Sequence, residues 1–119
     1  MLFVCYPNCG TCQRAKKLLE ANNVAFEERH IKANNPTVYE LKDWHKKSGL
    51  PLRKFFNTSG MLYRDLKLKD KLSEMSEDEM LRLLAADGML VKRPILVDDD
   101  FVLAGFKETE WKAALGISE

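Results

Sequence analysis

The sequence contains no apolar run close to the roughly 20 residues that a membrane-spanning helix requires. Its first apolar stretch, residues 2–6, is short and lacks the basic leader of a secretory signal peptide. No charge of one sign is in excess, since 19 Lys and Arg residues against 18 Asp and Glu residues leave a net charge of +1. These absences predict a cytoplasmic protein that binds neither membrane nor nucleic acid directly.

Cysteine is also scarce. The three cysteines, Cys5, Cys9 and Cys12, all fall within the first twelve residues. An odd count crowded into one short segment argues against a framework of structural disulfides, as does the reducing compartment that the absent signal peptide implies. The sequence therefore predicts thiols with a chemical role.

The first thirty residues predict a strand–helix–strand unit. Residues 2–6 are apolar and end at a Pro-Asn turn, which is typical of a buried strand. Apolar residues recur at helical spacing over residues 11–21, and Val24 is expected to begin a second strand. The C-x-x-C motif thus falls at the turn from strand to helix.

The rest of the chain predicts a helical insert, a hairpin and a last helix. Overall, the pattern predicts one α/β domain over residues 1–119, with an insert at about residues 36–90 between βαβ and ββα halves. Capping boxes and turn residues supply most of the boundaries. The predicted elements are helices from Thr37 to Gly49 and from Ser76 to Gly88, a helical turn at residues 52–56, strands at 94–97 and 101–104, and a helix around Trp111.

The C-x-x-C motif, in which Gly10 and Thr11 separate Cys9 from Cys12, is the most informative feature. A thiol in the first turn of a helix faces unpaired backbone N–H groups and the positive end of the helix dipole, which favour thiolate. Cys9, at the exposed start, is the predicted nucleophile, and Cys12 the predicted resolving thiol. The backbone N–H groups of this turn, including Gly10 and Thr11, are expected to bind substrate.

Other interpretations of the motif stay open from the residues alone. A C-x-x-C can be half of a zinc site, but there is no second C-x-x-C, and His30 and His45 lack zinc-finger spacing. Two cysteines can also be incidental core residues. The strand–helix–strand context favours redox chemistry, so no metal site is predicted. Cys5, in mid-strand between apolar neighbours, is predicted to be an inert core thiol.

Arg93 directly precedes the predicted hairpin, whose first strand begins at Pro94. An X-Pro bond at the start of a strand can be cis. If the hairpin strand runs beside the first strand, Pro94 lies opposite the C-x-x-C motif and Arg93 offers its donors to an oxyanion near Cys9. Spacing alone slightly favours the alternative, an exposed arginine in a loop.

Three segments together resemble the arsenate reductase/Spx-like family: residues 6–12 (YPNCGTC), residues 55–60 (FFNTSG) and residues 92–95 (KRPI). They stand in the family's order and spacing and span essentially the whole chain. The resemblance implies a thioredoxin-like (glutaredoxin-like) fold with a helical insert, and a cysteine at the Cys9 position that attacks arsenate. It also implies glutathione or glutaredoxin as the reductant and partner, and no bound cofactor.

The chain departs from the well-studied reductases around that cysteine. Where those enzymes commonly have serine, this chain has Cys12. Of their three arginines only Arg93 has a counterpart, since Asn57 falls near the second and residues 104–106 contain none. One arginine neutralises a dianionic oxyanion poorly, which predicts weak or absent arsenate turnover. Pro94 and the N–H groups of the motif are expected to complete the substrate site.

The resemblance leaves a second function open. Spx-type regulators bind the C-terminal domain of the RNA polymerase α subunit and use a C-x-x-C motif as a redox switch. Cys12 and the Gly105-Phe106 pair resemble that branch, whereas residues 57–60 resemble the reductases. The sequence therefore predicts a thiol–disulfide oxidoreductase, with a redox-sensing regulator as the alternative.

Overall fold

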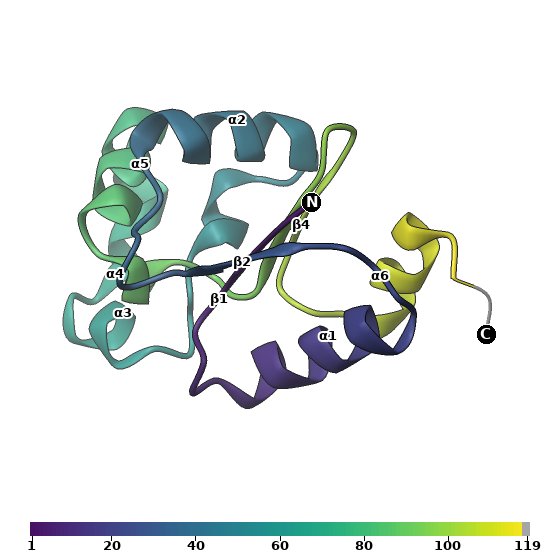
Figure 1. Cartoon of the computed structure of the whole chain (residues 1–119). Helices are drawn as coiled ribbons and strands as arrows, with labels where there is room; N and C mark the ends of the chain where they lie inside the picture. The colour runs from purple at the N-terminus through teal and green to yellow at the C-terminus, as the bar shows by residue number, and fades with distance from the viewer. Residues whose placement is uncertain (118–119) are drawn as a thin grey trace.

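The computed structural model describes residues 1–117, and a four-stranded mixed sheet runs through its centre (Figure 1). Strand β1 (Leu2–Cys5) pairs in parallel with β2 (Glu27–His30) and antiparallel with β3 (Ile95–Val97). Strand β4 (Val102–Ala104) pairs antiparallel with β3, so the strand order is β2-β1-β3-β4. The parallel pair is joined through helix α1 (Gly10–Ala21), as the strand–helix–strand prediction requires.

Helices cover both faces of the sheet (Figure 1). Helices α1 and α6 (Glu108–Leu115) lie on one face, and the segment between β2 and β3 covers the other. That segment contains α2 (Val38–Ser48), the 3₁₀ turn η1 (Leu52–Phe55), α3 (Met61–Asp65), α4 (Leu68–Lys71), η2 (Leu72–Glu74), α5 (Glu77–Ala86) and η3 (Gly88–Leu90). None of the helices within residues 1–117 is long and apolar enough to cross a membrane.

Alternation along the strands divides the core between the two faces. Phe3 and Leu96 pack toward α1 and α6. There the rings of Phe3 and Trp111 pack edge-on, with their centroids 6.2 Å apart. Val4 and Ile95, their neighbours in sequence, pack into the helical insert. Because successive strand residues point to opposite faces, β1 and β3 anchor both halves of the core.

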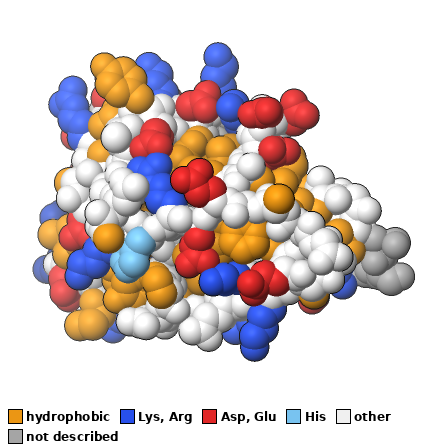
Figure 2. Space-filling view, in the orientation of Figure 1, with side chains coloured by type: hydrophobic (Ala, Val, Ile, Leu, Met, Phe, Trp, Pro, Cys, Tyr) orange, Lys and Arg blue, Asp and Glu red, His pale blue; other side chains and the backbone are white. Residues whose placement is uncertain are grey.

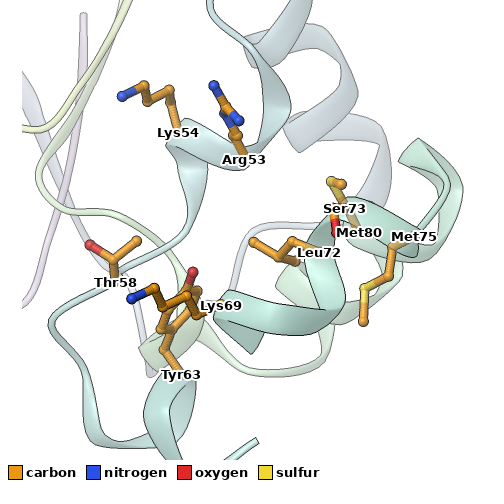
Figure 3. Close-up of a pocket in the computed structure, with 9 residues that line it drawn as sticks. All are labelled: Arg53, Lys54, Thr58, Tyr63, Lys69, Leu72, Ser73, Met75 and Met80. Carbon is orange, nitrogen blue, oxygen red and sulfur yellow. The ribbon is translucent and has the colours of Figure 1, made fainter. Parts of the chain in front are cut away.

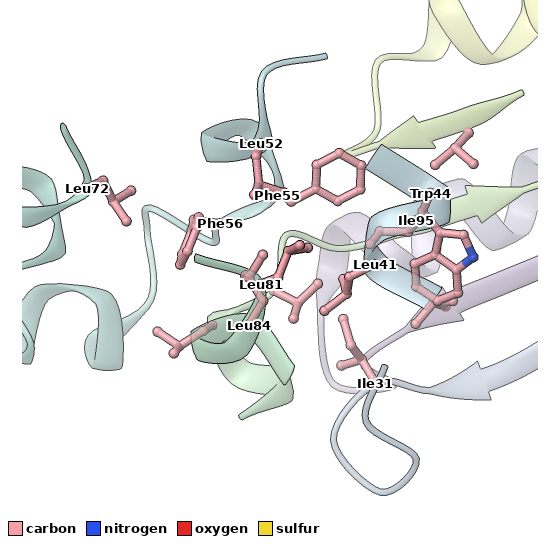
Figure 4. Packing of buried hydrophobic residues seen from close by; sticks show 14 of the residues in the cluster. Ile31, Leu41, Trp44, Leu52, Phe55, Phe56, Leu72, Leu81, Leu84 and Ile95 are labelled. Atoms are coloured by element: carbon pink, nitrogen blue, oxygen red, sulfur yellow. The ribbon is translucent and has the colours of Figure 1, made fainter. Parts of the chain in front are cut away.

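The core on the insert side draws on widely separated parts of the chain (Figure 4). Its buried side chains come from the sheet, from η1 and from α2 and α5, so the insert packs on the sheet through a continuous apolar cluster. The labelled members of this cluster are Ile31, Leu41, Trp44, Leu52, Phe55, Phe56, Leu72, Leu81, Leu84 and Ile95.

Most predicted boundaries are confirmed. Thr37 and Ser76 both form complete capping boxes, and the Arg93–Pro94 bond is cis. The second strand is a correction, since it begins at Glu27 and not at Val24. Its residues, Glu27 to His30, include no aliphatic side chain, because an edge strand is held by backbone pairing to β1 and is half exposed. The short helices over residues 61–74 also lack a clear periodic signal and were not predicted.

The face of the molecule seen in Figure 1 has mixed charge. In the space-filling view of that face, Lys and Arg side chains are interspersed with Asp and Glu, and apolar side chains lie between them (Figure 2). This face therefore presents no broad field of one sign, as the net charge of +1 predicts.

An ion pair joins the exposed edge of the sheet to the insert. Arg29 of β2 forms two hydrogen bonds with the carboxylate of Glu40 in the first turn of α2, one of them 2.9 Å from Nη2 to Oε1. The same carboxylate accepts the backbone N–H of Thr37 at 3.0 Å, and the Arg29 guanidinium lies 5.9 Å over the ring of Trp44. The Arg29 hydrogen bonds, followed by those from Thr37, outweigh partial burial and hold the pKa of Glu40 at about 2.

Glu40→Gln should lower the free energy of unfolding at pH 7 by about 1–3 kcal/mol, because the negative charge and one of the two oxygens that accept from Arg29 are lost. A carboxyl with a depressed pKa stabilises the fold above its unfolded value of about 4.3, and this stabilisation is lost as the pH falls toward 2. Denaturant unfolding of the two proteins should therefore differ at pH 7 and converge over that range. Glu79→Gln, at the matching capping-box position of α5, is the control and should cost less, since Glu79 forms no salt bridge within residues 1–117. If the two substitutions lower the free energy of unfolding equally, the effect comes from the capping box alone and not from the ion pair with Arg29.

Candidate functional site

Cys9 is the N-cap residue of α1 and has an extended backbone (φ −94°, ψ 121°). The Pro7-Asn8 turn leads from β1 into the helix, and the backbone N–H of Cys9 donates to the carbonyl oxygen of Tyr6 at 2.9 Å. The Cys9 side chain is half-buried, so its sulfur is accessible at the start of the helix. This is the position that the sequence predicts for the nucleophile.

The surroundings of Cys9 favour its thiolate. Partial burial raises the pKa of the thiol, but several hydrogen bonds to the sulfur lower it. The donors are, in order, the backbone and side chain of Cys12, the backbone of Thr11 and the side chain of Arg93. Together they bring the pKa of Cys9 below its ordinary value, because they stabilise the negative charge more than burial opposes it.

Cys12 and Cys5 have the opposite character. Cys12 is 2% exposed, and burial raises its pKa to about 12, although the backbone N–H of Tyr6 donates to its sulfur at 3.4 Å. Cys5 is 3% exposed, and burial followed by the charge of Glu28 raises its pKa to about 11. All three cysteines are free. The motif therefore combines one activated sulfur with a neutral thiol held one helical turn away.

A cleft of about 450 Å³ opens beside Cys9. It is predominantly polar and contains three cationic side chains, so it is suited to an anionic group. Helix α1, the loop before α3 and the segment before β3 all contribute to it. The lining residues are Cys9, Thr11, Arg14, Asn57, Ser59, Gly60, Lys92, Arg93 and Phe106.

Arg93 lies in this cleft and is half-buried, unlike the exposed loop arginine of the alternative interpretation. The pairing of Val4 with Ile95 sets β3 beside β1, which brings Arg93 to the C-x-x-C motif. Its guanidinium lies 5.2 Å over the ring of Tyr6 and donates to the carbonyl oxygen of Met89 at 3.4 Å. These contacts orient the side chain beside Cys9, where its guanidinium helps to lower the pKa of the thiol.

The other predicted site residues fall in two groups. Thr11 lines the cleft, and so does Asn57, which the family motif placed near a second arginine position. Gly10 is exposed in the first turn of α1, and Pro94 is buried with its carbonyl oxygen bonded to the N–H of Gly105 at 2.8 Å. Neither Gly10 nor Pro94 is among the residues that line the cleft.

Sequence reasoning missed two of the three cations, Arg14 and Lys92. Arg14 lies one helical turn after Thr11, and its Nη2 donates to the Thr11 hydroxyl at 3.2 Å. Lys92 precedes Arg93, within a motif that was recognised, and therefore carried a usable signal. Within residues 1–117, no three His, Cys, Asp or Glu side chains are grouped so as to hold a metal ion.

Iodoacetamide should alkylate Cys9 with a midpoint below the ordinary thiol value of about 8.5, because the groups around its sulfur lower the pKa. Cys5 and Cys12 should react only after unfolding, since both are buried. The rate for each cysteine can be followed against pH by peptide mass spectrometry, with Cys9→Ser as the control for the buried thiols. A Cys9 midpoint at or above about 8.5 would contradict the thiolate assignment.

Comparison with known proteins identifies the family. The model of the ArsC family matches residues 5–114. The uncharacterized protein YusI of Bacillus subtilis is 54% identical over 94% of this chain and 95% of its own length. The regulatory protein MgsR of the same organism is 32% identical over 92% of this chain and 86% of its own length.

Solved structures agree with this result. A Bacteroides fragilis protein described as ArsC-family related superposes with a TM-score of 0.92 at 55% identity and covers 94% of each chain. An arsenate reductase from Vibrio cholerae superposes with a TM-score of 0.79 at 27% identity, over 99% of this chain and 98% of its own. The thioredoxin-like α/β fold that the sequence predicts is confirmed, and the chain belongs to the ArsC family.

Proposed function

We propose that this protein is a thiol–disulfide oxidoreductase in which Cys9 is the nucleophile and Cys12 the resolving thiol. The observation that carries the proposal is the division between the two sulfurs. Cys9 is accessible and has a lowered pKa, whereas Cys12 is buried and has a raised one. A thiolate is the form that attacks, and a protonated thiol beside it waits until an adduct has formed.

The reaction has two exchange steps. First, the Cys9 thiolate attacks one sulfur of a substrate disulfide, the disulfide bond breaks, and the other half leaves as a thiolate. Cys12 then loses its proton and attacks the Cys9 sulfur, which releases the second substrate thiol and leaves a Cys9–Cys12 disulfide. The Tyr6 N–H, which donates to the Cys12 sulfur, is placed to stabilise the developing Cys12 thiolate.

Glutathione or glutaredoxin is the proposed source of electrons for the return step. Two of their thiol groups are oxidised to a disulfide while Cys9 and Cys12 return to free thiols, so no bound cofactor is required. The proposal includes a cytoplasmic location, because a reducing compartment keeps a pair of this kind available for another cycle.

Arsenate turnover is proposed as a weak reaction of the same cleft. An oxyanion there would meet Arg14, Lys92 and Arg93, so the prediction based on one cation understated the positive charge. Lysine binds as a point charge, and Arg14 already donates to Thr11. Arg93 is therefore the proposed bidentate ligand, and the other two cations supply less directed attraction.

A redox-sensing transcriptional regulator is the second candidate. The observation that favours it is the 32% identity to the regulatory protein MgsR over most of both chains. In this function the Cys9–Cys12 pair acts as the switch, and the C-terminal domain of the RNA polymerase α subunit is the proposed partner. Capture of that subunit in a manner that depends on oxidation, without glutathione-linked turnover, would favour the regulator over the enzyme.

Mild peroxide should convert the wild-type protein to a Cys9–Cys12 disulfide, because a Cys9 sulfenic acid is attacked by Cys12 with loss of water. Mass spectrometry should show the loss of two hydrogens in the N-terminal peptide, with Cys5 still free. Cys12→Ser should instead accumulate a Cys9 mixed disulfide when glutathione disulfide is added, and Cys5→Ser, the control, should behave as wild type. Wild-type protein that stays at the sulfenic acid stage would contradict the resolving role of Cys12.

Arg93→Ala should raise the arsenate concentration that protects Cys9 from iodoacetamide by about tenfold or more, since one charge-assisted hydrogen bond contributes about 1.5–3 kcal/mol. The alkylation midpoint without arsenate should change little, because Arg93 is the last in order among the hydrogen-bond donors to Cys9. Arg93→Lys keeps the positive charge but lacks the planar pair of donors. Its protective arsenate concentration should therefore lie between those of the wild type and Arg93→Ala. Protection that is unchanged in Arg93→Ala would contradict the oxyanion role.

A further inference from the structure

A second cavity, of about 420 Å³, lies within the helical insert (Figure 3). Leu72, Met75 and Met80 supply an apolar part, and side chains of η1 and α4 supply a basic part. Methionine side chains are flexible and polarisable, so they adapt to apolar groups of different shape. The cavity therefore pairs an adaptable apolar pocket with positive charge. Its basic residues are Arg53, Lys54 and Lys69.

This insert cavity is linked to the Cys9 cleft by lining residues that both share with a third hollow. This hollow, of about 280 Å³, shares Arg53, Lys54 and Thr58 with the insert cavity. It shares Lys92 with the Cys9 cleft. Backbone hydrogen bonds hold together the segments that carry these shared residues, since the Lys92 N–H donates to the Phe55 carbonyl oxygen at 2.7 Å. We call the cleft, the hollow and the cavity together the basic groove.

The basic groove concentrates charge of one sign. Seven cationic side chains line it, and its one carboxylate, that of Glu110, lies 3.8 Å from the ammonium group of Lys107. The chain as a whole has a net charge of only +1, so the concentration is local. Among the side chains of residues 1–117, those of Arg53, Lys54, Lys69 and Lys92 form no salt bridge. Such a groove attracts an anionic partner.

The shape of the groove distinguishes between anionic partners. An inorganic anion would occupy only part of the Cys9 cleft and would leave the apolar part of the insert cavity empty. A single-stranded nucleic acid gains much of its affinity by stacking on open aromatic faces, whereas Tyr63 packs against Phe56 with ring centroids 6.4 Å apart. An acidic polypeptide with an apolar side chain matches both the charge and the apolar pocket.

We propose that the basic groove binds an acidic polypeptide segment that presents a disulfide sulfur to Cys9 and inserts an apolar side chain into the insert cavity. This inference rests on the proposed function and names its substrate class, protein disulfides flanked by acidic residues. Cys9 attacks the sulfur of the segment, the partner half of that disulfide leaves as a thiolate, and a Cys9–segment disulfide forms. Cys12 then displaces the segment as a thiol, so oxidation of the Cys9–Cys12 pair balances reduction of the substrate.

Three cysteine peptides, each carried as a mixed disulfide with thiopyridine, provide the test. One is rich in Glu with a single Leu, the second replaces Leu with Ser, and the third replaces Glu with Lys. The rate of pyridinethione release by the reduced protein reports attack by Cys9. The acidic Leu peptide should react about tenfold faster than the basic peptide, and about 1 M salt, with a screening length of about 3 Å, should remove this advantage. The acidic Ser peptide should react several-fold more slowly than the acidic Leu peptide, because it cannot fill the apolar pocket.

Charge reversal locates the effect in the groove. The double variant Lys54→Glu, Lys69→Glu should lose the preference for the acidic peptides. The double variant Lys17→Glu, Lys46→Glu makes the same change in net charge at exposed positions outside the groove and should retain the preference. Circular dichroism of both variants checks that they fold alike.

Neutral dipyridyl disulfide separates this inference from the proposed function. If Cys9 fails to react with that small probe, the oxidoreductase proposal itself is wrong. If the small probe reacts rapidly but acidic and basic peptides react at equal rates, the groove assignment alone is wrong. A preference that survives reversal of Lys54 and Lys69, or an oligonucleotide that competes better than the free acidic peptide, would also overturn the groove assignment.

Discussion

The antiparallel pairing of β3 with β1 is the constraint on which the site depends. It aligns Val4 with Ile95, and so brings Arg93 and Lys92 to the end of β1 where the C-x-x-C motif begins. The two segments are separated by most of the chain, and backbone hydrogen bonding joins them without any contribution from the reactive side chains. The same strands carry apolar residues on both faces, which holds α1 and the insert in place around the site.

Burial separates the chemistry of thiols that lie close together in the sequence. Cys9 and Cys12 occupy one turn of one helix, yet the pKa of the first is lowered and that of the second is raised to about 12. The helix start supplies donors to Cys9, whereas the side of α1 that carries Cys12 packs against the sheet. A pair with one accessible and one buried sulfur can therefore act in order, with attack first and resolution second.

The helical insert gives this member of the ArsC family a surface that the thioredoxin-like core alone does not provide. Segment 55–58 leads away from the Cys9 cleft and is held by hydrogen bonds to residues 90–92, such as the one of 2.8 Å from the Asn57 N–H to the Leu90 carbonyl oxygen. Because this segment is shared by neighbouring hollows, charge at the insert can influence which molecules reach Cys9.

The sequence by itself determined the features whose signals lie in neighbouring residues. The helix start at Cys9, the capping boxes at Thr37 and Ser76, and the hairpin all follow from short-range hydrogen bonding and periodicity. The family motifs added the place of Arg93, which spacing alone did not favour.

Only the tertiary structure decided the position of β2, the presence of Arg14 and Lys92 beside Cys9, and the lining residues shared by neighbouring hollows from the cleft to the insert cavity. An edge strand without aliphatic residues is defined by its partner strand, and a lysine or arginine on a solvated face looks the same in sequence wherever that face lies. These features depend on contacts between residues far apart in the chain, and such contacts leave no local pattern to be recognised.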